Sequence, residues 1–250
     1  MTGAATDPGG DRSLDGRVAV VTGATGTLGG VVAERLAAAG ARLVLAGRDR
    51  ARLEAVAAGL ELGDDRRIAV VGDLDAAGTA EIARASEAAF GRLDIVVHLV
   101  GGYAGGSPIA ETEPSELETM LGQHVWTTFL LARATAPALR RSGRGRLIAV
   151  TSPFGANPPG GNAAYAAAKA AQESLVRSLA QESRGSGATA NVIQVRTIDN
   201  ARERLTAPSA KNARWTTPEE IASTIVWLSG PDTDQVTGTV IPLFGGPVPG

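Results

Sequence analysis

Two residues of one alanine-rich stretch, AAYAAAKAAQ, have side chains suited to acid–base chemistry. Tyr165 and Lys169 stand four residues apart, so in a helix they project from one face, about one turn from each other. A free tyrosine titrates at about pH 10, and a nearby ammonium group favours the phenolate and lowers that pKa. We therefore predict that this pair transfers a proton at neutral pH.

A serine hydroxyl, that of Ser152, precedes the Tyr165–Lys169 pair at the end of a predicted strand. Ser152 ends the apolar segment GRLIAVTS, thirteen residues before Tyr165, where its hydroxyl can orient a carbonyl or alcohol oxygen. A Tyr-x-x-x-Lys pair by itself is also typical of a solvated helix face. It is Ser152 that favours a catalytic interpretation of Tyr165 and Lys169.

A glycine-rich turn, TGATGTLG, follows the valine-rich segment RVAVVT near the start of the chain. Glycines let the backbone turn tightly and approach a pyrophosphate, and the helix expected over residues 28–39 offers unpaired N–H groups to it. An ordinary tight turn is the alternative. The pattern predicts a dinucleotide phosphate site formed by Gly23, Thr25, Gly26, Thr27, Leu28 and Gly29.

The end of the next predicted strand bears on which dinucleotide binds. A carboxylate there holds the ribose diol of NAD, whereas a basic group accommodates the 2′-phosphate of NADP. Gly47 falls where the acid is expected and Arg48 follows it, which favours NADP. NAD stays an alternative if Asp49 turns inward, and Arg48 is then a solvated surface arginine. Asp73, after the third strand, is expected near the adenine or as a loop cap.

These residues require a framework of alternating strands and helices. Short apolar runs predict strands at 17–22, 41–47, 67–73, 93–101, 145–152, 188–196 and 238–244. Periodic segments predict helices at 28–39, 50–60, 76–90, 116–139, 164–184 and 218–228. The fold class is α/β: one Rossmann-type domain over residues 14–250, a doubly wound parallel sheet of about seven strands flanked by helices. We expect a flexible tail at 1–13 and a mobile lid at 197–214.

Composition narrows the class of partner. The net charge is −2 and the 24 basic residues are scattered, so we expect no nucleic-acid or membrane surface and a small-molecule substrate instead. The absence of cysteine and the presence of only two histidines exclude thiolate and histidine-rich metal sites, so no metal is expected. The start of the sequence lacks the blocks of a signal peptide, and no apolar run reaches the roughly 20 residues of a membrane span. We expect a cytoplasmic protein.

Together these motifs resemble the short-chain dehydrogenase/reductase superfamily, over nearly the whole chain from Leu14 to Gly246. The resemblance implies that Ser152 holds the substrate oxygen and that Tyr165 donates or accepts the proton. It implies that Lys169 holds the nicotinamide ribose and acidifies Tyr165. It also implies a homodimer or homotetramer. Further similar landmarks are Asp73-Leu74, residues 218–222, residues 236–238 and the glycines at 245–246; Leu74 is expected beside the cofactor with Asp73.

The chain departs from the family pattern at three places. Residues 98–101 read His-Leu-Val-Gly where the family commonly has Asn-Asn-Ala-Gly, with Gly101 expected at the cofactor. The asparagine that usually completes the catalytic tetrad appears as His124, which either replaces it in a proton relay or packs in the core. The proline-glycine after the sixth strand is missing, so Thr197 and Ile198 are expected to contact the nicotinamide amide.

Three functions follow from these observations. The first is an NADP(H)-dependent carbonyl reductase or alcohol dehydrogenase, based on Ser152, Tyr165 and Lys169. The second is a dihydropteridine reductase-like reduction of a quinonoid ring, suggested by the glycine spacing and the GGYAGG loop. In that case Tyr103, Trp126 and Trp215 would stack on a flat ring, although core or subunit contacts also account for them. The third is a dinucleotide-binding sensor with little turnover.

Overall fold

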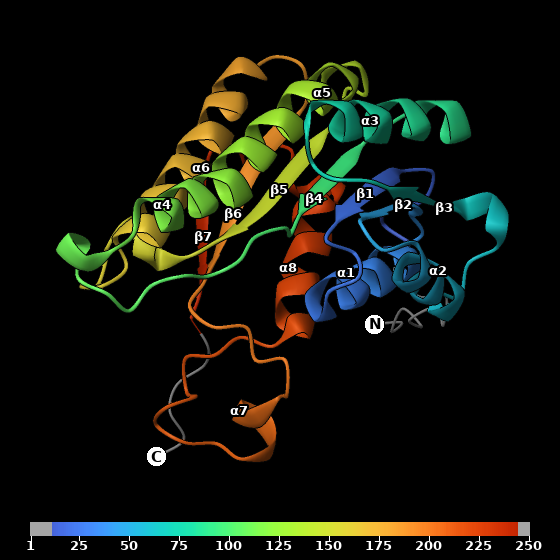
Figure 1. Cartoon of the computed structure of the whole chain (residues 1–250). Coiled ribbons are helices and arrows are strands. Elements are labelled where there is room, and N and C mark those ends of the chain that lie inside the picture. The colour runs from blue at the N-terminus through green and yellow to red at the C-terminus, as the bar shows by residue number, and fades with distance from the viewer. Residues whose placement is uncertain (1–11, 245–250) are drawn as a thin grey trace, which may run out of the picture.

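Seven parallel strands form one sheet at the centre of this computed structural model, which describes residues 12–244 (Figure 1). The strands are β1 (Val18–Thr22), β2 (Arg42–Gly47), β3 (Arg67–Val71), β4 (Ile95–His98), β5 (Arg146–Thr151), β6 (Thr189–Val195) and β7 (Val240–Leu243). Their order across the sheet, β3-β2-β1-β4-β5-β6-β7, confirms the predicted doubly wound fold. The order reverses between β1 and β4, so a ligand crevice is expected at their carboxyl ends.

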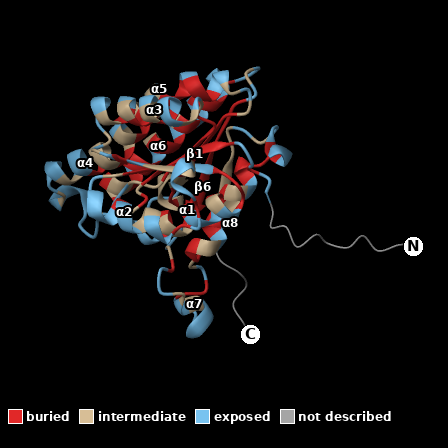
Figure 2. Ribbon diagram, turned by 90° about the vertical axis from the view of Figure 1, so that its right-hand side faces the viewer, coloured by how far each residue is buried: buried red, intermediate tan, exposed pale blue. Residues whose placement is uncertain are grey.

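Helices cover both faces of the sheet (Figure 1). One face carries α1 (Thr27–Ala38), α2 (Arg50–Gly59) and α8 (Pro218–Ser229), and the other carries α3 (Ala76–Phe90), α4 (Pro114–Met120), α5 (Thr127–Arg141) and α6 (Ala163–Glu182). Because strand side chains alternate in direction, β1 serves both cores: Ala19 and Val21 pack with α1 and α8, and Val18 and Val20 pack with α3, α5 and α6. The buried residues gather along the sheet (Figure 2).

The helix predicted over 116–139 is interrupted. It consists of α4, a π-helical turn η3 (Leu121–Trp126) and α5, so the predicted continuous helix is wrong at this turn. A π turn inserts one residue into the helical repeat, and a periodicity of 3.6 residues does not reveal a single insertion. Short π segments occur often at functional sites, and this one contains His124.

The segment expected as a mobile lid, 197–214, contains a short helix, α7 (Glu203–Thr206), and several anchoring contacts. The carboxylate of Asp199 accepts hydrogen bonds from the backbone N–H groups of Glu203 and Arg204, both at 2.8 Å. Arg202 and Arg204 form ion pairs with Glu219 and Glu220 of α8. The segment is therefore tied at one side to the start of α8.

Remaining short turns are η1 (Asp64–Arg66), η2 (Ile109–Glu111), η4 (Pro153–Gly155) and η5 (Pro231–Thr233). Residues 1–11 of the predicted tail and the landmark glycines at 245–246 lie outside the described residues. Leu14 is fully buried, and its N–H donates to the carbonyl of Ala39. In the part that is described, no helix combines the length and apolar character needed to cross a membrane.

Candidate active site

A groove of about 830 Å³ opens at the carboxyl ends of β1 and β4, where the strand order reverses. Seven of the predicted cofactor residues line it: Gly23, Thr25, Gly26, Arg48, Asp73, Leu74 and Gly101. Thr27, Leu28 and Gly29 form the first turn of α1 behind its wall. The structure therefore brings the glycine turn, the end of β2 and the end of β4 to one site.

The glycine turn has the geometry of an anion cradle. Gly23 has a φ of 71°, and a Cβ at Gly29 would lie 2.2 Å from the carbonyl oxygen of Gly23, so a side chain at Gly29 would push α1 away. Among the described residues, no side chain caps α1, whose N-cap is Gly26. Its first N–H groups and the positive end of its dipole face the groove, which suits a pyrophosphate.

The charged residues that line the groove are Arg48, Asp73 and Asp75. The Arg48 guanidinium lies 4.0 Å from the carboxylate of Asp73, and both side chains are largely exposed. Asp49 caps α2, since its carboxylate accepts the N–H of Arg52 at 3.1 Å. The Arg52 guanidinium donates to the carbonyl of Thr25 at 2.9 Å. Asp49, the residue considered for holding the ribose of NAD, is thus engaged at the helix terminus.

Tyr165 projects from α6 into a set of three rings. The ring centroids of Tyr103, His124 and Phe154 lie 5.1, 5.6 and 6.0 Å from that of Tyr165, all edge to face. Burial raises the pKa of Tyr165 above its usual value, and a hydrogen bond with Ser152 opposes that rise. The Tyr-x-x-x-Lys spacing predicts that Lys169 lowers this pKa, but in the structure burial has the larger effect and raises it.

Ser152 directly follows β5, caps the short turn η4 and is buried. Its oxygen accepts the N–H of Phe154 at 3.3 Å, which leaves the hydroxyl proton free to be donated. The Ser152 hydroxyl lowers the pKa of Tyr165, so these two hydroxyl groups lie near each other. A substrate oxygen held there can accept hydrogen bonds from the hydroxyls of Ser152 and Tyr165.

Lys169 is 6% exposed and has two acceptors within reach. Its Nζ donates to the carbonyl of Val150 at 3.1 Å and to Oε1 of Gln172 at 2.9 Å. The ammonium lies 5.8 Å from the centroid of the Tyr165 ring. Desolvation lowers the pKa of Lys169 to about 7, so the group changes charge near neutral pH.

His124 is buried in the π turn. Its Nε2 lies 2.9 Å from the carbonyl oxygen of Gly102, and its Nδ1 has no partner among the described residues. A Cβ at Gly101 would lie 2.4 Å from the His124 ring, so glycine at 101 makes room for it. Burial, with a smaller contribution from the charge of Lys169, lowers the pKa of His124 to about 4. The imidazole is therefore neutral at pH 7.

His98, at the end of β4, lies between two threonine hydroxyls and contributes to the packing of the fold. Its Nδ1 lies 2.9 Å from the hydroxyl of Thr22 and its Nε2 lies 3.3 Å from that of Thr127. Burial lowers the pKa of His98 to about 3. The neutral ring thus links β1, β4 and α5 beneath the groove.

Thr197 and Ile198 follow β6 and stand outside the lining of the groove, within the described part of the chain. Ile198 bridges to Thr216, and the carbonyl of Thr197 accepts the N–H of Thr216 at 3.0 Å. Their contact with a nicotinamide stays a prediction.

The three aromatic residues considered for stacking have separate neighbours. Tyr103 meets Tyr165, and the Trp126 ring meets Phe129 at 6.2 Å. Trp215 has the ammonium of Lys211 at 5.9 Å from its centroid. Of the three, Tyr103 is the one that reaches Tyr165.

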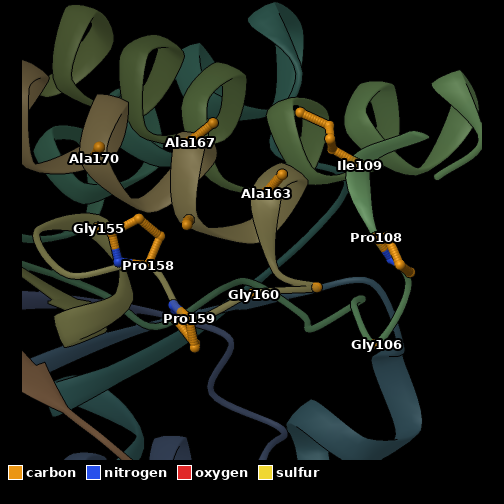
Figure 3. A pocket seen from close by; sticks show the side chains of 12 residues that line it. Gly106, Pro108, Ile109, Gly155, Pro158, Pro159, Gly160, Ala163, Ala167 and Ala170 are labelled. Carbon is orange, nitrogen blue, oxygen red and sulfur yellow. The ribbon is translucent and has the colours of Figure 1, made fainter. Parts of the chain in front are cut away.

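A second groove, of about 900 Å³, lies along the outer face of α6 (Figure 3). Alanines of α6 form its floor, and glycine, proline and Ile109 from two loops form its walls. This lining carries no side chain that could bind a charge or move a proton. Tyr165 and Lys169 do not line this groove, whereas the glycine turn lines the first one.

Two further residues of the site, Gln172 and Thr128, were not predicted from the sequence. Both are buried, and they connect Lys169 to the π turn by side-chain hydrogen bonds. A signal existed, because Gln172 stands three residues after Lys169 on the same helical face, and Thr128 stands four residues after His124.

Comparison with known proteins supports this picture. A family model described as short chain dehydrogenase matches residues 17–207. The chain is 34% identical to the rhamnolipids biosynthesis 3-oxoacyl-[acyl-carrier-protein] reductase of Pseudomonas aeruginosa, over 94% of this chain and 97% of that protein. A short-chain dehydrogenase/reductase structure from Serratia marcescens superposes with a TM-score of 0.82 at 28% identity, covering 94% of this chain and 98% of that one. A 3-ketoacyl-(acyl-carrier-protein) reductase from Brucella melitensis, solved with NADH, has a TM-score of 0.82 and 26% identity, over 93% and 98% of the two chains.

Proposed function

This chain belongs to the short-chain dehydrogenase family and is an oxidoreductase, and from that premise we propose that it reduces the carbonyl group of a small substrate with NADPH. One observation carries the proposal: Ser152, directly after β5, lies close enough to Tyr165 of α6 to act on its pKa, beside the groove that holds the glycine turn. The residues of that groove fit a dinucleotide, because α1 presents its uncapped start to it.

The described side chains support a reduction in the following way. A bound nicotinamide dinucleotide would supply the hydride. Ser152 donates a hydrogen bond to the substrate oxygen and fixes it against Tyr165. Burial keeps the Tyr165 phenol protonated at neutral pH, which suits a group that donates its proton to the developing alkoxide. The charged form of Lys169 stabilises the phenolate that remains.

The proposed preference for NADP rests on Arg48. Arg48 is exposed just after β2 and offers a cation to the groove. The carboxylate of Asp49 is used as the cap of α2, so it is not free to hold a ribose. A 2′-phosphate gains from that cation, whereas a ribose diol does not.

The substrate class is tested first with a 3-oxoacyl thioester, because the Pseudomonas relative is named for reducing that group. The assay follows NADPH or NADH consumption over this thioester, simple ketones and aldehydes, and quinonoid dihydropterin. Turnover of a carbonyl supports the proposal. Turnover of the pterin alone favours the second hypothesis, and cofactor binding without any turnover favours a sensor.

We also propose that the chain forms a homodimer or homotetramer. Large apolar side chains are exposed along α4, η3 and α5, among them Leu117, Trp126 and Phe129. Exposed apolar patches of this kind mark protein contacts. Light scattering after size-exclusion chromatography of the wild type and of Phe129→Glu tests this, since a monomeric wild type contradicts it.

A further inference from the structure

The ammonium group of Lys169 has one side-chain acceptor, Gln172, among the hydrogen bonds of the described residues. The other acceptor is the backbone carbonyl of Val150 at 3.1 Å. Gln172 is fully buried and lies almost one helical turn after Lys169, 2.9 Å from its Nζ. An ammonium group in an apolar interior keeps its charge only when acceptors surround it. Gln172 is therefore placed to control both the charge and the position of Lys169.

The amide of Gln172 is itself fixed in orientation. Its Nε2 donates to the hydroxyl of Thr128 in α5 at 3.0 Å, and that hydroxyl donates to the backbone carbonyl of His124 at 2.6 Å. Because the Thr128 proton is used on His124, the Thr128 oxygen accepts from Gln172. Gln172 then presents its oxygen, not its amino group, to Lys169. The hydrogen bonds run in one direction, from Lys169 through Gln172 and Thr128 to the π turn.

Four ionisable groups lie around Lys169: Glu173, His98, His124 and Tyr165. The charge of Glu173, the next residue after Gln172, raises the pKa of Lys169. His98 and His124 both feel the charge of Lys169, and both are neutral at pH 7. Tyr165 is protonated there as well. Gln172 is neutral, so replacing it removes a hydrogen-bond acceptor of Lys169 without removing a charge.

We propose that Gln172 is a positioning residue, which, anchored by Thr128, holds the Lys169 ammonium charged and in place beside Tyr165. Its effect on turnover rests on the proposed function, whereas its effect on Lys169 does not. The two can therefore be tested separately.

The first test measures Lys169 directly. The sequence contains two lysines, Lys169 and Lys211, so protein labelled with ¹³C-lysine gives two sets of side-chain signals, which Lys211→Arg assigns. Burial lowers the pKa of Lys169 to about 7, within reach of an NMR titration of the full chain. Gln172→Leu, of similar volume, should lower that pKa by roughly one further unit, as expected for one lost hydrogen bond to a charged group. Gln172→Glu should raise it.

A matched pair of threonine variants tests the anchor. Thr128→Val removes the partner of Gln172 and should shift the Lys169 titration in the same direction as Gln172→Leu. Thr135→Val is the control, because Thr135 is also buried in α5 and also donates to a backbone carbonyl, that of Leu131 at 2.8 Å. It should leave the titration unchanged. An unshifted Lys169 titration in folded Gln172→Leu and Gln172→Glu overturns the proposal.

The second test uses turnover. Carbonyl reduction should slow as pH rises through the pKa of Lys169, because the neutral amine no longer stabilises the phenolate. Gln172→Leu should move that falling limb of the kcat profile to lower pH and Gln172→Glu to higher pH, in step with the NMR values. Shifted NMR titrations in a protein that reduces no carbonyl refute the proposed function and leave the role of Gln172 standing. A limb that stays fixed while the lysine signal moves shows that Gln172 does not act on the reaction and overturns its positioning role.

Discussion

The Tyr103 hydroxyl donates a hydrogen bond to the side-chain oxygen of Asn162 at 2.8 Å, and this contact ties the loop after β4 to the start of α6. The same ring packs edge to face on Tyr165, 5.1 Å between centroids. These are the two tyrosines of the sequence, and they are neighbours. Tyr103 is 63% exposed, whereas Tyr165 is partly buried against Ser152, so the two phenols are chemically distinct.

Substitution of each tyrosine should separate structure from chemistry. Tyr165→Phe removes the proton donor and should lower kcat by roughly 100-fold or more, while the Kd for NADPH stays nearly unchanged. Tyr103→Phe is the matched control, because it loses only the hydrogen bond to Asn162; its kcat should fall by less than about tenfold. Steady-state kinetics and nicotinamide fluorescence titration measure both quantities. Wild-type turnover in Tyr165→Phe would refute the mechanism.

Arg48 should discriminate between the two dinucleotides. Arg48→Ala removes a charged hydrogen-bond donor to a 2′-phosphate and should weaken NADPH binding by roughly 10- to 100-fold. NADH binding should not change. Arg50→Ala serves as the control, since Arg50 is exposed nearby and pairs with Glu54 of α2 at 3.7 Å. Equal effects of Arg48→Ala on both dinucleotides, or no effect on either, contradict the preference for NADP.

The neutral state of His124 leads to a prediction for the pH profile. Its pKa is lowered to about 4, so the imidazole does not titrate between pH 5.5 and 9, a range in which about 3% or less of it is charged. His124→Asn should therefore leave the number and position of the limbs in the kcat/KM profile unchanged and alter the rate by less than about tenfold. Loss of a limb would instead support the relay interpretation of His124.

The fold could be predicted because its signals are local. Apolar runs and glycine turns fixed the strands to within a few residues, and the alternation of elements implied the parallel sheet. The break at η3 could not be predicted, since one inserted residue leaves the apolar pattern of α4 and α5 almost unaltered.

The candidate site was partly predictable for a related reason. Ser152, Tyr165 and Lys169 are set by one strand end and one helix face, and the structure does bring them together. The raised pKa of Tyr165 was missed, because the strength of burial depends on Tyr103, His124 and Phe154, which come from three other segments. The orientation of the Gln172 amide toward Lys169 likewise depends on how α5 packs against α6, because Thr128 of α5 accepts a hydrogen bond from it.

The two buried histidines should make stability fall in mild acid. Burial lowers the pKa of His98 to about 3 and of His124 to about 4, from 6.5. For a base whose folded pKa is depressed, the unfolded chain binds the proton first, so stability is full above pH 6.5 and is lost as pH falls toward the folded pKa. For His124 alone this amounts to about 2 kcal/mol between pH 7 and pH 5.

Urea unfolding at pH 7 and pH 5 tests this difference. His124→Asn removes one of the two titrating groups, so its free energy of unfolding should fall by about 2 kcal/mol less than that of the wild type over the same pH interval. At pH 7 the variant should be less stable than the wild type by about 1–2 kcal/mol, because the ring packed on Tyr165 is lost. Thr135→Val should lose stability equally at both pH values. A wild type whose stability is constant from pH 7 to pH 5 would show that the folded chain binds these protons, and hence that the two imidazoles are not held neutral.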